Sequence, residues 1–239
     1  MPSESNHIVS AFDEDLRQMD NFIAEMGGLA EHQFADSIKA LIARDSELAE
    51  RVIGNDHRID ELEHLVDAHT ISMLALRQPM ADDLRVVITA LRIASLIERI
   101  GDYAKNISKR TVAITQTPPV GPSRTISRMG VVVQGMIKTV LDAYLQRDAD
   151  LAEDVRQRDE EVDALHTSLF RELLTYMMED PRSISACTHL LFVAKNIERI
   201  GDHATNIAEN VYFLVHGKLP EEPRPKGDES SYTVIGGDD

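Results

Sequence analysis

Acidic side chains recur at a spacing of four residues in a longer pattern, Glu-x-x-x-Asp-x-x-x-Asn. The pattern occurs twice, at Glu98, Asp102 and Asn106 and again at Glu198, Asp202 and Asn206. Residues four apart share one face of an α-helix, so each copy places three oxygen-bearing side chains in a line about 12 Å long. Small residues beside them, including Gly101 and Gly201, let a neighbouring helix approach closely.

Two pairs of aspartates lie upstream of these patterns and are also four residues apart. Asp60 precedes Pro79 by 19 residues and Glu98 follows it by 19, while the second copy has 18 and 17 residues around Pro181. Antiparallel helices joined by a tight turn place equal counts at equal height. The sequence therefore predicts two clusters of four carboxylates: Asp56, Asp60, Glu98 and Asp102, and Asp159, Asp163, Glu198 and Asp202.

Four adjacent carboxylates repel one another, so either some of them are protonated or a cation lies between them. Protonation of several acids at neutral pH costs free energy, so a bound cation is the favoured alternative. Oxygen ligands suit Mg, Ca, Mn or Fe better than a metal that prefers thiolate. His57 and His203 lie near the clusters, but the other copy has Glu160 and Tyr103 at the matching positions. We predict metal sites built from the eight acids together with Asn106 and Asn206 as further oxygen ligands.

Two other interpretations of the acidic patterns are open. Acids four apart on a helix are commonly solvated and paired with basic neighbours, here Arg99 and Arg199, and such clusters would belong to a purely structural adaptor. A ferritin-like di-iron enzyme would use similar carboxylates, but it needs a repeated Glu-x-x-His, and the motif at 61–64 has no second copy at an offset of 103. The repetition of the pattern favours metal binding or structured polar binding.

The elements that must position these residues are long helices. Apolar residues recur three and four apart between sparse Pro and Gly positions, and no stretch alternates with the period of a strand. Asp180 followed by Pro181 is typical of a helix start. The six predicted helices have the approximate bounds Ile8–Ala43, Glu47–Arg77, Ala81–Ile114, Arg124–Gln146, Ala149–Glu179 and Pro181–His216.

The chain is an internal duplication. Residues within 44–60 match residues within 147–163 at an offset of 103, and 98–102 is identical to 198–202 at an offset of 100, while Lys105 becomes Thr205. The three lost residues fall at the hairpin turn, where a helical protein tolerates deletion. We therefore predict an all-α fold of two pseudo-symmetric three-helix bundles, at 1–116 and 124–217, with a proline-rich linker at 117–123 and an acidic, disordered tail at 218–239.

Composition excludes several classes of function. The 239 residues carry 25 Lys+Arg against 41 Asp+Glu, a net charge of −16, which is the opposite of a nucleic-acid-binding footprint. A single Cys excludes a disulfide framework. The sequence has no signal-peptide pattern and no apolar run of about 20 residues that would insert into a membrane. We expect a cytoplasmic protein.

Several sequence motifs resemble those of one known family. Two copies of Glu-Arg-Ile-Gly-Asp, each followed by Asn four residues on, look like the signature of the PhoU family of phosphate-transport accessory proteins. The segments Leu-Arg-Val-Val-Ile-Thr-Ala-Leu-Arg-Ile at 84–93, Ile-Asp-Glu-Leu-Glu at 59–63 and Arg-Gln-Pro-Met-Ala-Asp-Asp-Leu-Arg at 77–85 are similar to that family too. The resemblance covers about residues 7–216.

The resemblance implies a fold of two spectrin-like three-helix bundles and a regulatory rather than an enzymatic function. Such proteins are usually homodimers, and they carry iron or zinc clusters on paired acidic motifs, which correspond here to the eight acids above; Mn or Mg would also suit these ligands. They regulate phosphate uptake through the ATPase of a phosphate ABC transporter. They also keep a phosphate-sensing histidine kinase in its repressing state when phosphate is ample. We expect the same adaptor function here.

Overall fold

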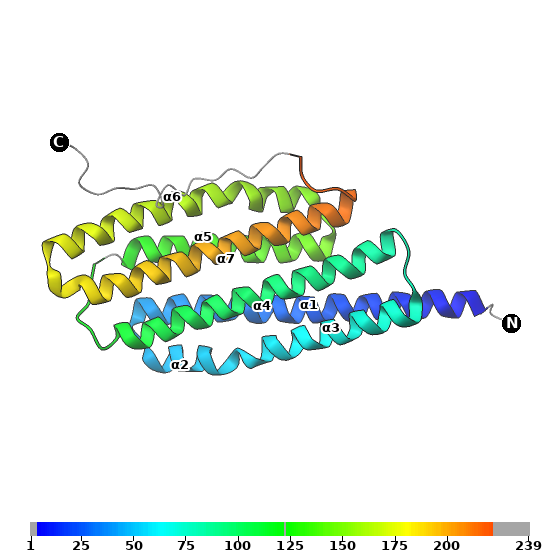
Figure 1. Cartoon of the computed structure of the whole chain (residues 1–239), viewed down its shortest axis with the longest axis horizontal. Helices are drawn as coiled ribbons and strands as arrows, with labels where there is room; N and C mark the ends of the chain where they lie inside the picture. The colour runs from blue at the N-terminus through cyan, green and yellow to red at the C-terminus, as the bar shows by residue number, and fades with distance from the viewer. Residues whose placement is uncertain (1–3, 122, 222–239) are drawn as a thin grey trace.

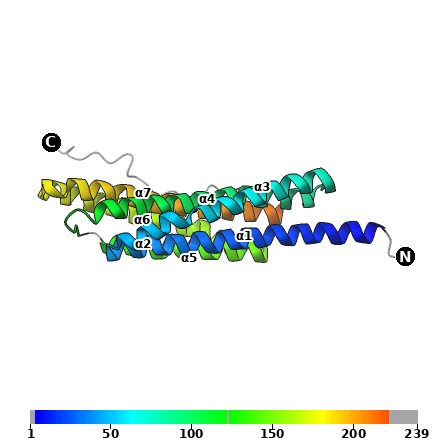
Figure 2. The same cartoon turned by 90° about the horizontal axis from the view of Figure 1, so that it is seen from below.

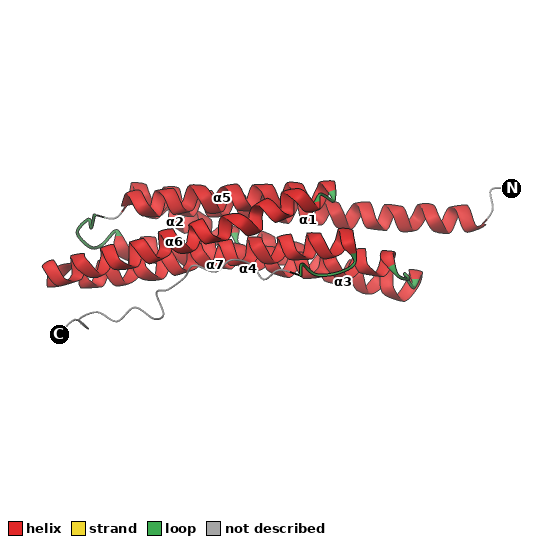
Figure 3. Cartoon of the chain, turned by 90° about the horizontal axis from the view of Figure 1, so that it is seen from above, coloured by secondary structure: helices red, strands yellow, loops and turns green. Residues whose placement is uncertain are grey.

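The structure, a computed structural model of the chain, describes residues 4–121 and 123–221, and in these ranges it contains helices and connecting loops but no strand (Figure 1, Figure 3). A single turn of 3-10 helix at Pro181–Ser183 precedes the last long helix. The α-helices are α1 (Glu4–Ala43), α2 (Ser46–Asn55), α3 (His57–Arg77), α4 (Asp82–Ile114), α5 (Ser123–Gln146), α6 (Ala149–Glu179) and α7 (Ile184–His216).

The connection between the first and second helices has the same structure in both copies. The Asp45 side chain caps α2 by accepting from the backbone N–H of Leu48, and the Asp148 side chain caps α6 by accepting from the N–H of Leu151. Arg44 and Arg147, which precede these caps, both have φ of 54°. Non-glycine residues rarely adopt this left-handed conformation. Its recurrence at matching positions shows that the duplication preserves backbone geometry as well as sequence.

The second helix of the first copy is interrupted, whereas its counterpart α6 is continuous. The predicted helix Glu47–Arg77 is present as α2 and α3, with a turn at Asp56 between them. Gly54 and Asn55, which are weak helix formers, precede the turn, and the matching positions in α6 are Gln157 and Arg158, which favour helix. The interruption places Asp56 at a helix junction.

The seven helices form two bundles that pack lengthwise against each other (Figure 1, Figure 2). Helices α1 to α4 form the first bundle and α5 to α7 the second, and α4 and α7, which are equivalent in the duplication, are in extensive contact. The N-terminal part of α1 projects beyond the other helices (Figure 2). The Tyr144 hydroxyl of α5 donates to Asp20 Oδ1 of α1 at 2.6 Å, which ties the bundles together on a second side.

One hydrophobic core runs through both bundles. Ile97 and Ile100 of α4 and the matching Ile197 and Ile200 of α7 are almost fully buried in the same cluster. Burial of such side chains contributes about 1.5–3 kcal/mol each, so the bundles stabilise one another as well as themselves.

The predicted all-α fold of two three-helix bundles is confirmed. The Asp180 side chain accepts from the backbone N–H of Arg182, as the predicted helix start requires, although the first turn there is 3-10. Within the described residues, no helix contains an apolar stretch long enough to cross a membrane. The tail was predicted to be disordered, and its residues from 222 onward lie outside the part of the chain that the structure describes.

Candidate functional site

The first acidic cluster is organised around Asp56, which is 2 % exposed at the junction of α2 and α3. Gln33 Nε2 of α1 donates to Asp56 Oδ1 at 2.8 Å and to the Gly101 carbonyl of α4 at 3.1 Å. Lys105 Nζ of α4 donates to Asp56 Oδ2 at 2.5 Å and lies 3.6 Å from Asp102 Oδ1. Three helices therefore converge on one buried carboxylate, and its charge is balanced by a lysine of the same chain.

Close approach of the helices depends on Gly101. A Cβ added there would lie 2.8 Å from Ile59 Cδ1 and 3.5 Å from Asp56 Oδ1. At the equivalent Gly201 of α7, an added Cβ would meet Val162 at 3.5 Å, which is ordinary contact. The first copy is therefore packed more tightly at its acidic cluster than the second.

The outer part of the first cluster consists of carboxylates that repel one another. Partial burial and the neighbouring charges of Asp102, Glu63 and Asp60 raise the pKa of Glu98 to about 7. Burial and the charge of Asp56 raise the pKa of Asp60 as well, although Lys105 opposes that shift. The structure thus places Asp56, Asp60, Glu98 and Asp102 in one region of mutual repulsion, with Glu63 as an additional member.

The second acidic cluster is more deeply buried. Asp159 and Asp163 of α6 are 2 % and 6 % exposed, and Glu198 of α7 is 6 % exposed. Thr205, which occupies the position of Lys105, donates its hydroxyl to Asp159 Oδ1 at 3.2 Å. Lys195 Nζ donates to Glu198 Oε1 at 2.8 Å.

Asp202, the fourth predicted acid of this cluster, is half-buried on α7, one turn beyond Glu198.

Asn106 and Asn206 each line an open cleft on the surface. Asn106 lines an open cleft between α4 and α7 together with Lys109, Arg110, His189 and Asn196. Asn206 lines a second cleft at the equivalent place near Glu209 and Asn210, and its backbone carbonyl accepts from Asn210 Nδ2 at 2.8 Å.

The two clusters differ in how well they suit a metal ion. In residues 4–121 and 123–221, no group of three or more His, Cys, Asp or Glu side chains is arranged to hold one. A metal ion at Asp56 would compete with the ammonium of Lys105, which is already in contact, so the first cluster suits a metal less well than the second. The second cluster combines three buried carboxylates with a threonine hydroxyl, and this oxygen-rich set matches the chemistry of Mg, Mn or Fe.

Three residues of the first cluster do not belong to the predicted set. Gln33 and Glu63 gave no signal, because neither forms part of a repeated acidic motif and their roles depend on tertiary contact. Lys105 did give a signal, because it interrupts an otherwise repeated segment where the second copy has Thr205. The Glu-x-x-His motif at 61–64 faces outward at its first residue, since Glu61 is about half exposed and pairs with Arg58 at 3.2 Å.

Comparison with known proteins gives consistent results. A family model described as the PhoU domain matches residues 23–111 and again 126–211. The chain is 50 % identical over 226 residues to the phosphate-specific transport system accessory protein PhoU homolog of Rhizobium meliloti, covering 94 % of this chain and 95 % of that protein. It is also 50 % identical over 225 residues to the homolog of the same description from Caulobacter vibrioides, covering 94 % and 98 %.

Solved structures show the same similarity in three dimensions. The crystal structure of PhoU from Pseudomonas aeruginosa superposes with a TM-score of 0.84 at 41 % identity, covering 87 % of this chain and all of that one. The phosphate transport system regulatory protein PhoU from Streptococcus pneumoniae gives a TM-score of 0.82 at 28 % identity, covering 88 % of this chain and all of that one.

Proposed function

The chain belongs to the PhoU family, and on this premise we propose that it is an accessory protein of a phosphate-specific transport system that regulates phosphate uptake and represses the phosphate-starvation response, including alkaline phosphatase, when phosphate is ample. The observation that carries the proposal is the near full-length similarity to such proteins, which includes both copies of the duplicated motif. The proposed role is regulatory and involves no reaction catalysed by this chain.

We further propose that the protein works as an adaptor in the cytoplasm. Its long helices lie side by side and offer extended faces on which other proteins can dock (Figure 3). The proposed partners are the ATPase of the phosphate transporter and a phosphate-sensing histidine kinase, and the proposed assembly is a homodimer. Large side chains exposed on these faces, such as Ile71, Leu76 and Phe192, suit protein contacts better than solvent.

Metal binding is proposed for the second acidic cluster. Asp159, Asp163, Glu198 and Asp202 would hold the ion, which when bound would neutralise part of their charge. Because these residues belong to α6 and α7, a metal ion bound between them would hold the two helices together. The metal would be iron, zinc, manganese or magnesium, and its effect would be structural.

The test of the regulatory role is deletion of the gene followed by measurement of alkaline phosphatase in phosphate-rich medium. Constitutive alkaline phosphatase that is repressed again by the intact gene supplied in trans would support the proposal. Normal repression in the deletion strain would contradict it. A matched control supplies the gene with Lys39→Thr, an exposed substitution on α1 that should restore repression fully.

A further inference from the structure

A basic cleft lies on the surface where α4 meets α7, outside the acidic clusters. It has a volume of about 430 Å³ and is lined by Asn106, Lys109 and Arg110 of α4 and by His189 and Asn196 of α7. No acidic side chain lines it in the described part of the chain, although the protein as a whole carries a net charge of −16. At about 30 Å³ per water in the liquid, this volume accommodates a small anion with several waters.

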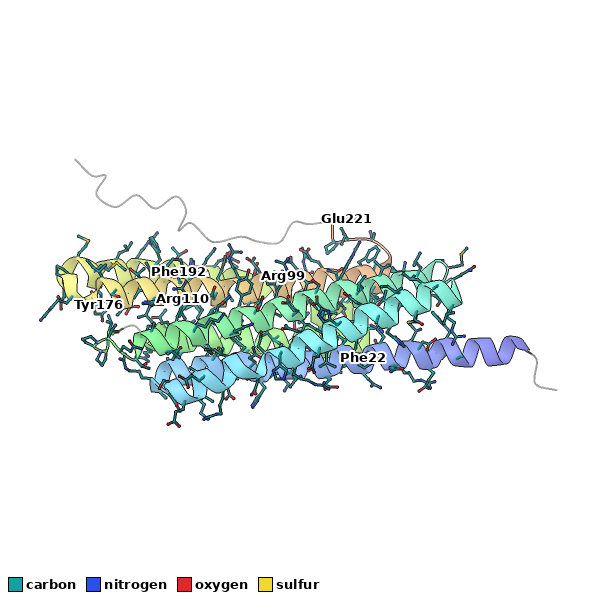
Figure 4. The ribbon with its side chains drawn as sticks, turned by 60° about the horizontal axis from the view of Figure 1, so that its bottom comes forward. Phe22, Arg99, Arg110, Tyr176, Phe192 and Glu221 are labelled. Carbon is teal, nitrogen blue, oxygen red and sulfur yellow. The ribbon has the colours of Figure 1, made fainter. Side chains whose placement is uncertain are left out.

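The charged groups of the cleft are held in place by their neighbours. The Arg110 guanidinium lies over the Phe192 ring, with its central carbon 4.0 Å from the ring centroid (Figure 4). Arg110 Nη1 is 3.5 Å from His189 Nδ1. Because arginine can only donate, a neutral His189 in this contact carries its proton on Nε2, which leaves that N–H as a further donor. Stacking also limits the conformational freedom that Arg110 would lose on binding an anion.

The duplication supplies an internal comparison. The equivalent cleft of the second copy has a glutamate, Glu209, in place of Lys109 and an asparagine, Asn210, in place of Arg110. On its α4 side it is lined by Arg92, Ser95 and Leu96. Glu209 also approaches Arg156, with Oε1 3.9 Å from Nε. The second cleft therefore offsets its one arginine with the carboxylate of Glu209, whereas the first cleft has two basic side chains, Lys109 and Arg110, and no acidic side chain among its lining residues.

We propose that the cleft formed by Asn106, Lys109, Arg110, His189 and Asn196 binds a tetrahedral oxyanion, namely inorganic phosphate. Arginine presents a planar fork of N–H donors and lysine a compact positive charge, and together they match the oxygens of phosphate. The two asparagines add amide donors, and their carbonyl oxygens can accept from the proton that hydrogen phosphate retains at neutral pH. The choice of phosphate among oxyanions rests on the proposed function.

The negative charge of the molecule does not prevent such binding. At physiological ionic strength the Debye length is about 8 Å, so exposed carboxylates farther away are largely screened. The groups that line the cleft therefore dominate the potential that a small anion experiences there. Phosphate bound in this place would contact both α4 and α7, the two helices that join the bundles.

The experiment is equilibrium dialysis of the full-length protein against radiolabelled inorganic phosphate, with circular dichroism of each variant to verify folding. Lys109→Glu gives the cleft the charge found in the second copy, and loss of one hydrogen bond between charged groups should weaken phosphate binding about ten-fold or more. The matched control is Lys39→Glu, which makes the same change of charge at an exposed site on α1 and should bind phosphate like the unmodified protein.

Selective weakening by Lys109→Glu, with competing sulfate much less effective than unlabelled phosphate, would support the proposal. Absence of phosphate binding to the unmodified protein, equal weakening by the two variants, or equal competition by sulfate would overturn it. The alkaline phosphatase assay separates this result from the proposed function. Normal repression in the deletion strain contradicts the function, whereas intact complementation with no phosphate bound contradicts only the phosphate site.

Discussion

Replacement of Lys105 by threonine, the residue found at the matching position of the second copy, tests whether this lysine neutralises the first acidic cluster. Removal of one partner from a fully buried ion pair costs about 3–5 kcal/mol. The Asp56 side chain is 3 % exposed, but that of Lys105 is 27 % exposed, so water can reach the gap. Gln33 also continues to donate to Asp56 at 2.8 Å.

We therefore expect Lys105→Thr to lower the free energy of unfolding by about 2 kcal/mol, below the cost for a fully buried pair. For a protein of this size, that loss corresponds to a decrease in Tm of about 4–8 °C. The measurement is urea denaturation followed by circular dichroism in the presence of a chelator. Lys109→Thr is the matched control, since it makes the same change one turn away at an exposed position, where the effect should stay within about 0.5 kcal/mol.

A second measurement on the same variant concerns metal. If Lys105 occupies the position of a cation, its removal should create a site, and millimolar Mn²⁺ should stabilise Lys105→Thr more than the unmodified protein. Equal stability of Lys105→Thr and Lys109→Thr would refute the view that the lysine neutralises a buried carboxylate. Destabilisation without any gain in Mn²⁺ response would show that the ion pair matters but that a metal cannot replace it.

Three further predictions follow from the two clusters. Gly101→Ala should destabilise the protein by about 1 kcal/mol or more through overpacking, whereas Gly201→Ala should be neutral or stabilising because alanine favours helix; thermal unfolding distinguishes them, and equal effects would contradict the difference in packing. Because the pKa of Glu98 is about 7 in the folded chain against 4.5 ordinarily, the folded state binds the extra proton and loses stability as pH rises through this window. Glu98→Gln should remove that loss, so its gain in Tm over the unmodified protein should be larger at pH 8 than at pH 5, and a pH-independent gain would count against the raised pKa. Asp202→Ala should lower bound metal, measured by elemental analysis of the protein, more than Asp102→Ala does, and equal loss would argue against a metal preference for the second cluster.

The fold was predictable because the same signals occur twice. Among the described residues, proline lies only outside the α-helices, and aspartate caps at Asp45 and Asp148 begin matching helices, so most helix ends lie within a few residues of their predicted positions. The turn at Asp56 was not predicted, because Gly54 and Asn55 lower helix propensity only weakly. Contacts of Asp56 with side chains from α1 and α4 accompany the turn, and such tertiary contacts are not visible in a local pattern.

The candidate site was predictable in position but only partly in chemistry. Counting residues from each hairpin turn predicted which acids share a height, because equal counts along antiparallel helices are equal distances. The same counting could not identify what each acid contacts. Gln33 reaches Asp56 from a helix outside the hairpin, and the matching position in the second copy is Met136, so no repeated motif marks it. The spacing rule also placed Asn106 in line with the acids, but it could not show that this residue lines an open cleft together with residues of α7.

The differences between the two copies carry more functional information than their likeness. Duplication produced two similar backbones, and α4 and α7 retain the same acidic signature. Within two turns of that signature, however, α4 has Lys105 and Lys109 where α7 has Thr205 and Glu209. One lysine contacts a buried carboxylate and the other lines an open cleft, so a single helix supplies positive charge both to the interior and to the surface. A change that made the copies equal at these two positions should therefore preserve the fold while removing the features that set the first bundle apart from the second.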